Sequence, residues 1–471
     1  MTRLYLPPFV NAIRSLVAAS HSLRQPRKHP DTSSPVIVVE KSADISLDGV
    51  PTAEFCAIHL QLLELFADLR GRVEEWGRNS GMGAEEVWET FVKLAVARFT
   101  CWFQHASRST IEMETSVPPL DVLMAWHSFM LNPHAYQVFS KAARSDGAGN
   151  EGILWPELQR SISPDGEGGG SLRWKLSGRD VEAADRLGLH ADMLGFLMET
   201  LEASKCDTLV DSLSELCRDS LGRETKLQKL LETYHELSQT GFAYRNLGLD
   251  FDLASAVQRQ TVFALKMTRF GWHHSPFCAA AIEQARERYR CFFSLIPSLP
   301  AGENAVPTLD IDLVWHTHQL SPAEYANFSK AMTGGRFVNH NDTITEEVAS
   351  SGSKNTGTRY REQFGEVYSI CLSWYCQAAR LAPDKRLSRA DIEQIRDAIA
   401  SERRRRKLDL ASCRCNETVV LTGLFGAGGV GECAPPVDTC GSGCGGGGGG
   451  ECAAPNASCD GNCGGCGGCG G

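Results

Sequence analysis

The chain has 471 residues, of which 42% are apolar and 22% charged, and this composition is typical of a folded globular protein. Its formal net charge of −10 argues against a general binder of nucleic acids or anionic membranes. No uninterrupted apolar stretch is long enough to predict a transmembrane helix. Asn11 and Arg14 interrupt the first apolar run, so we expect no signal peptide and a reducing, cytoplasmic environment.

Residues 1–43 are predicted to form a flexible basic arm. They are rich in Pro, Ser and Arg, and the first 30 contain five basic residues and no acidic one. This composition resembles that of a mitochondrial transit peptide, but Pro7 and Pro8 would interrupt an amphipathic helix. Mitochondrial import is therefore the alternative to a disordered arm.

Residues 44–411 are predicted to form a mainly α-helical body. Residues 55–66, 87–103, 227–237 and 253–267 carry apolar side chains at intervals of three and four. Strand-like alternation is scarce, with Val36–Val39 as the best short run, and residues 145–171 are predicted to be a surface loop. A last helix from about Ser388 is expected to end in the basic run Arg403–Lys407, whose alternative role is nuclear import.

An internal repeat is the strongest signal in the body. Residues 117–142 and 306–331 align without a gap, 189 positions apart, and 13 of the 26 residues are identical. Upstream, residues 98–103 resemble residues 288–293. We therefore predict two related units, at about 53–145 and 250–345, each containing a helix, a tight corner and a second helix.

Most of the repeated motif can be explained as architecture. The residues predicted to pack the corners are Trp126, His127 and Tyr136 in the first copy, and Trp315 and Tyr325 in the second. Ser321 and Glu324 fit a capping box around Pro322, and Asp310 in a first helical turn suits the helix dipole.

The second copy resembles the glycine-rich domain-containing protein-like family. Residues 309–325, which include the segment Trp-His-Thr-His-Gln-Leu, carry the resemblance, together with Asn339–Thr343, residues 364–376 and the Gly/Cys-rich tail. The resemblance covers about residues 45–380. It implies a domain of unknown function, without catalytic residues to transfer. Some plant members add an RNA-recognition module, but no such strand pattern is visible here.

A metal site is the sharpest chemical hypothesis for the second copy. His316, His318, His340 and Asp342 are the candidate ligands, with types that suit zinc or a non-haem metal. Asp312 is expected to support the site from behind, by holding the other ring nitrogen of His316. Positions 316 and 318 point about 200° apart on a helix. The alternative is a structural role, in which His316 is buried beside Asp312 and His318 is exposed.

Other histidines and cysteines of the body carry weaker signals. His273 and His274 lie in a short linker and are expected to be exposed, whereas Cys371 and Cys376 are expected in the core of an aromatic helix. No Walker loop, nucleophile elbow or dinucleotide-binding fingerprint is present in the sequence.

Residues 412–471 are predicted to be a disordered Gly/Cys-rich tail. Ten of the 18 cysteines lie at or after Cys413. Their spacing is compatible with thiolate metal binding, and the candidate ligands are Cys440, Cys444, Cys459, Cys463, Cys466 and Cys469. The composition of the tail predicts no hydrophobic core, and the alternative to metal binding is a flexible interaction segment.

The first functional hypothesis is a non-enzymatic interaction or regulatory protein that binds protein partners. The alternatives are a metal-dependent enzyme centred on the second repeat and thiol metal binding by the tail.

Overall fold

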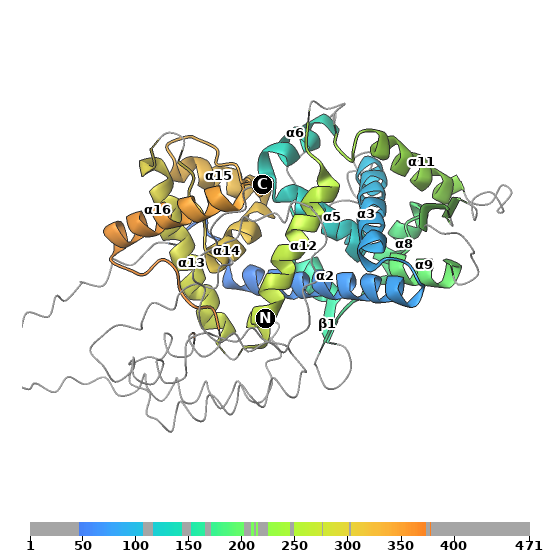
Figure 1. The fold of residues 1–471 in the computed structure, drawn as a ribbon, viewed down its shortest axis with the longest axis horizontal. Coiled ribbons are helices and arrows are strands. Elements are labelled where there is room, and N and C mark those ends of the chain that lie inside the picture. The colour runs from blue at the N-terminus through green and yellow to red at the C-terminus, as the bar shows by residue number, and fades with distance from the viewer. Residues whose placement is uncertain are drawn as a thin grey trace, which may run out of the picture.

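The computed structural model describes residues 47–106, 116–143, 152–164, 171–201, 209–211, 213–214, 225–244, 249–275, 277–300, 303–373 and 377. In these residues the fold is mainly α-helical, as predicted (Figure 1). A two-stranded antiparallel sheet of β1 (Ile162–Pro164) and β2 (Leu172–Trp174) places Ser163 opposite Arg173. The N-terminal arm, the last predicted helix and the tail lie outside the described residues. None of the described helices is long and apolar enough to cross a membrane.

Two groups of four helices follow one another along the chain. The first group is α2 (Ala53–Asn79), α3 (Ala84–Ala106), α5 (Leu120–Met130) and α6 (Pro133–Ala143). The second is α12 (Leu253–Phe270), α13 (Cys278–Leu295), α14 (Leu309–Gln319) and α15 (Pro322–Met332). Both groups contain the helix–corner–helix order that the repeat predicts.

Shorter elements connect and complete the two groups. Between them lie α7 (Trp155–Ser161), the small sheet, α8 (Gly178–Arg186), α9 (Met193–Leu201) and α11 (Thr225–Gln239), and α11 packs on α3. Two single-turn helices, η2 (Trp272–His274) and η3 (Ile296–Ser298), flank α13, and α16 (Glu346–Phe364) follows α15 and packs on α13.

The leading helices of the two groups begin in the same way. The Thr52 side chain accepts a hydrogen bond from the Phe55 amide at the start of α2, and the Asp252 side chain accepts one from the Ser255 amide at the start of α12. Such caps satisfy amide groups that have no partner within the helix. Gly271, with φ 57°, ends α12 in a left-handed conformation that favours glycine.

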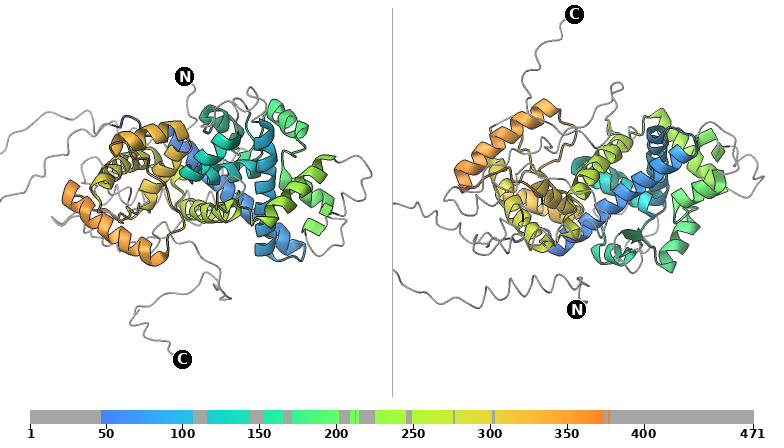
Figure 2. Two further views of the ribbon diagram at one scale, coloured as in Figure 1. Left: turned by 90° about the horizontal axis from the view of Figure 1, so that it is seen from above. Right: turned by 60° about the horizontal axis from the view of Figure 1, so that its bottom comes forward.

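The two leading helices cross at the centre of the molecule. α2 packs against α12, and each also packs on the other group, α12 on α5 and α2 on α14 (Figures 1 and 2). Within the groups, α3 packs on α5 as α13 packs on α14. The exchange of contacts buries a continuous apolar core between the groups.

Equivalent buried contacts occur in both groups. The Nε atom of Arg98 lies 2.6 Å from Oδ2 of Asp121, and the same two atoms of Arg288 and Asp310 are also 2.6 Å apart. Arg288 follows Arg98 by 190 positions, and Asp310 follows Asp121 by 189. The indole nitrogen of Trp126 donates to the Tyr136 hydroxyl at 3.0 Å, and Trp315 donates to Tyr325 at 3.0 Å. The predicted packing aromatics therefore also form hydrogen bonds that fix each corner.

Three local predictions are wrong. Ser321 makes no side-chain cap on α15, and its hydroxyl instead accepts a hydrogen bond from Trp155. Residues 145–171 are not wholly a loop, since they include α7 and β1, and Trp155 is buried. The stretch from Phe364 is not one helix, because α16 ends at Gly365, which has φ 69°. Cys371 is half-buried beyond this end, and Cys376 lies outside the described residues.

Candidate metal centre

Asp312 and His316 lie one turn apart on the same face of α14. The Oδ1 atom of Asp312 is 3.3 Å from the Nε2 atom of His316. This proximity follows from their spacing, because residues four apart are neighbours on a helix surface. The Arg288–Asp310 pair, with Thr308, holds the first turn of the same helix.

His340 reaches this pair from the segment that follows α15. The Tyr325 hydroxyl donates to the Val338 carbonyl oxygen, and the Val338 amide donates to Ser329, both at 2.7 Å. The Nδ1 atom of His340 donates to the Leu131 carbonyl oxygen at 2.9 Å. In the neutral ring Nε2 is then unprotonated, as metal binding requires.

The three ligand atoms form a small triangle. His340 Nε2 lies 3.4 Å from His316 Nε2 and 3.8 Å from Asp312 Oδ1, and the third side is 3.3 Å. Ligands at tetrahedral angles around zinc are about 3.3–3.6 Å apart, whereas ligands at right angles are about 2.8–3.1 Å apart for the same bond lengths. Two sides of the triangle fall in the tetrahedral range and the third, at 3.8 Å, is slightly longer, so the triangle suits a tetrahedral ion better than an octahedral one.

Burial keeps His316 in its ligand form. The side chains of Asp312 and His316 are each 1% exposed and that of His340 is 9% exposed. Burial, with the neighbouring His340, holds the pKa of His316 well below its usual range. A neutral imidazole offers a lone pair without first losing a proton.

The triangle borders a cavity of about 960 Å³. Asp312, His316 and His340 all line it, next to Trp315 and Phe263. The Phe263 ring lies 4.5 Å from that of His316, and the Trp315 ring 5.0 Å from that of His340. A fourth coordination position can therefore face a space large enough for a small molecule.

Two of the predicted ligands lie elsewhere. His318 is on the opposite side of α14, where its Nδ1 atom is 3.0 Å from the Tyr289 hydroxyl, and it is buried, so the exposure expected of it in a structural role is wrong. Asp342 accepts hydrogen bonds from Arg259 at 3.1 Å and Gln260 at 3.2 Å. The structure thus brings together His316, His340 and Asp312, with Asp312 in the place of a ligand, although we predicted only a supporting role for it.

The first unit has a histidine pair at the matching place. His127 Nε2 lies 2.9 Å from His59 Nε2, and His59 Nδ1 lies 2.9 Å from the Thr317 hydroxyl. The Thr317 hydroxyl donates its proton to the Leu313 carbonyl oxygen, so it can only accept from His59 Nδ1. In the neutral His59 ring Nε2 then has no proton and accepts a hydrogen bond from His127 Nε2. Leu123 stands where the second unit has Asp312, and this pair therefore has no carboxylate.

A second cluster was missed by the sequence analysis. His273 and His274 were expected to be exposed, but His274 is buried and His273 is half-buried against Glu64 of α2, with Nε2 atoms 3.0 and 2.7 Å from Glu64 Oε2 respectively. These are ion-pair distances, shorter than tetrahedral ligand spacing. Burial alone would raise the pKa of Glu64, but both histidines oppose it and hold that pKa at about 2.

The geometry defines a helical protein with a candidate mononuclear metal site between two four-helix groups. The sequence profile of the glycine-rich domain-containing protein-like family matches residues 220–327, which include α14 and His316. The predicted resemblance to this family is thereby confirmed.

Two curated plant proteins are similar to the chain. Glycine-rich domain-containing protein 1 of Arabidopsis thaliana is 26% identical over 289 residues, which cover 59% of this chain and 29% of that protein. Glycine-rich domain-containing protein 2 of the same plant is 25% identical over 293 residues, covering 59% and 30%. The matched region thus spans less than a third of either relative. No solved structure matches the chain.

Proposed function

We propose that the chain binds one zinc ion through Asp312, His316 and His340 and uses it as a metal-dependent enzyme. The observation that carries this proposal is the triangle of ligand atoms, with sides of 3.3, 3.4 and 3.8 Å, at the wall of a cavity. Three protein ligands and one open position are typical of catalytic zinc, whereas structural zinc has four protein ligands.

The chemistry supported by such a site is activation of water or polarisation of a substrate oxygen. Zinc lowers the pKa of a bound water to about 7, which generates a nucleophile at neutral pH. His340 is oriented for this role by Leu131, and such partners of metal-binding histidines raise ligand basicity. The class of reaction proposed is therefore hydrolysis or hydration.

Cobalt substitution tests the geometry and the activity together. Co²⁺ in a tetrahedral protein site absorbs visible light strongly, whereas octahedral Co²⁺ absorbs weakly. We expect the Co²⁺-loaded full chain to show the tetrahedral bands and metal-dependent hydrolysis of 4-nitrophenyl acetate. His340→Ala, made in a chain whose six candidate tail thiols are changed to Ser, should lose both. Octahedral bands, or hydrolysis that is unchanged in His340→Ala, would contradict the proposal.

The tail remains a separate candidate for metal binding. Its six candidate thiols lie outside the described residues, and the interaction role predicted from sequence remains the alternative function of the chain. A variant with all six changed to Ser separates the sites. It should keep the tetrahedral Co²⁺ bands of the histidine site and lose the absorption of Co²⁺ bound to the tail, which includes sulfur-to-metal charge transfer.

A further inference from the structure

One face of α12 forms a wall of the cavity beside the metal centre. Arg259, Phe263 and Lys266 lie three or four positions apart on this face, and all three line the cavity. The Phe263 ring lies against the His316 ring, and Lys266 lies about one helical turn further along α12 from Phe263.

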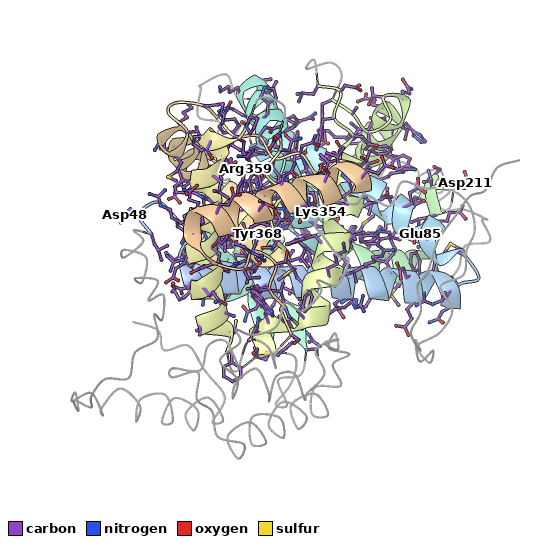
Figure 3. The ribbon with its side chains drawn as sticks, turned by 60° about the vertical axis from the view of Figure 1, so that its left-hand side comes forward. Asp48, Glu85, Asp211, Lys354, Arg359 and Tyr368 are labelled. Carbon is purple, nitrogen blue, oxygen red and sulfur yellow. The ribbon has the colours of Figure 1, made fainter. Side chains whose placement is uncertain are left out.

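The carboxylates that line the cavity already have partners. Glu85 accepts from Arg70 at 3.2 Å, and Asp342 from Arg259 at 3.1 Å. Glu303 accepts from Arg359 of α16 at 3.3 Å, and Figure 3 shows Arg359 on that helix. Asp312 belongs to the metal triangle. Glu85 shares Arg70 with Glu74 and is largely exposed, and among the described residues none of these four carboxylates forms an ion pair with Lys266 or Arg336.

Two cations in the cavity wall have no carboxylate partner among the described residues. Lys266 is half-buried and forms no ion pair there, and Arg336 donates only to the Ile296 carbonyl oxygen at 3.4 Å. A zinc ion held by one carboxylate and two neutral histidines would add a further net positive charge. The cavity with its metal would therefore favour an anion.

Apolar and aromatic side chains also line the cavity near the candidate metal site, among polar ones. Phe263, Trp315 and Phe337 line the cavity together with Pro307. Trp315 cannot turn away, because its indole nitrogen is bonded to Tyr325. Such a wall buries a hydrocarbon or aromatic group, whereas the two cations and the metal bind a charged one.

We propose that the cavity binds a small organic anion, with its carboxylate or phosphate group between the metal and Lys266 and its apolar body against Phe263 and Trp315. This inference rests on the proposed zinc site and names the substrate class of that site. It predicts that charge decides binding between ligands of the same shape.

Calorimetric titration of the zinc-loaded full chain with benzoate, phenyl phosphate and benzamide tests this. Benzamide has nearly the shape of benzoate but no charge. We expect at least one of the two anions to bind at least tenfold more tightly than benzamide. The better anion identifies the headgroup. Equal binding of benzamide, or no binding of either anion, would overturn the inference.

Substitution of Lys266 locates the anion. Lys266→Met should weaken binding of the better anion by about tenfold or more, and Lys266→Arg should restore most of it. The matched control is Lys354→Met, an exposed change on α16 (Figure 3), which should leave binding unchanged. Binding that is unaltered in Lys266→Met would also overturn the inference.

Zinc content, measured on the same samples, separates the two proposals. If the protein contains zinc but does not bind the anions, the proposed substrate class is wrong and the proposed metal site still stands. If the protein contains no zinc, the proposed function itself is wrong, whether or not the anions bind.

Discussion

The Nδ1 atom of His340 donates a hydrogen bond to the carbonyl oxygen of Leu131, a residue 209 positions earlier in the chain. The bond turns the other ring nitrogen toward His316 and Asp312. Its acceptor lies at the corner between α5 and α6 of the first group. The candidate metal centre of the second group therefore depends on the packing of the first group against it.

The opposite corner has a matching bond. The Ile153 amide donates to the carbonyl oxygen of Leu320 at 2.9 Å, and Leu320 follows Leu131 by 189 positions in the repeat alignment. Each group thus receives a hydrogen bond at its corner from a segment that follows the other group's last helix. We infer that the two groups are related units that hold each other's corners.

Gly152→Ala should destabilise this contact. A Cβ atom at position 152 would lie 2.3 Å from the Leu320 carbonyl oxygen, so the backbone has to shift. We expect a loss of about 1–3 kcal/mol in the free energy of unfolding, measured by urea denaturation. Gly71→Ala in α2 is the control, because a Cβ there meets no atom within 4 Å. That change should be stabilising by about 0.5–1 kcal/mol. Equal effects of the two changes would contradict the contact.

The two buried ion pairs should be comparably important. Asp121→Asn leaves Arg98 without its charged partner, and Asp310→Asn does the same to Arg288. Each should lower the free energy of unfolding by about 3–5 kcal/mol, since a buried charge is left uncompensated. The exposed pair of Lys93 and Glu89 is the control, and Glu89→Gln should cost less than about 1 kcal/mol in thermal or urea unfolding. A small loss for either buried change would show that its pair is not equivalent.

Glu64 should make the protein acid-sensitive. Its pKa is held at about 2 in the folded chain, below the ordinary value of 4.5. The stabilisation is therefore present above pH 4.5 and is lost as the pH falls toward 2, and it amounts to roughly 3 kcal/mol. Glu64→Gln should flatten this part of the curve of unfolding free energy against pH. An unchanged slope between pH 4.5 and 2 would contradict the ion pair.

His127 should add a second acid-sensitive step at higher pH. Burial lowers its pKa from 6.5 to about 3, so the unfolded chain binds a proton that the folded chain excludes. The free energy of unfolding should fall as the pH drops from 6.5 toward 3. His127→Phe removes this proton, and its unfolding free energy should depend less steeply on pH in that window. The same slope in the variant would show that His127 is protonated in the folded state.

The sequence predicts the helices of this protein better than its site. Apolar spacing and the repeat predict the mainly helical fold and the helix–corner–helix order, because burial of one face of each helix determines both. The spacing of Asp312 and His316 also places them together. The remaining members of the site depend on the path of the chain after α15, which the sequence does not predict. This path brings His340 to the pair, whereas Asp342 binds Arg259 instead.

Residues distant in sequence explain the other errors. His273 and His274 look like linker residues until Glu64 is found opposite them. His318 looks like a surface substitution for Phe129, yet it is buried against Tyr289. The hydroxyl of Ser321 accepts from Trp155, more than 160 positions away, and does not cap α15 as the local pattern predicts. The local sequence pattern around each of these residues cannot indicate such distant partners.

The zinc content of the purified full chain tests the central claim most directly. Elemental mass spectrometry should be applied to the parent, His316→Ala, His340→Ala and His318→Phe. Tail thiols are the same in all four, so differences between them report the histidine site alone. We expect His316→Ala and His340→Ala each to lose about one zinc per chain, and His318→Phe, which restores the residue type of the first unit, to lose none. Equal zinc content in the parent and His316→Ala would contradict it.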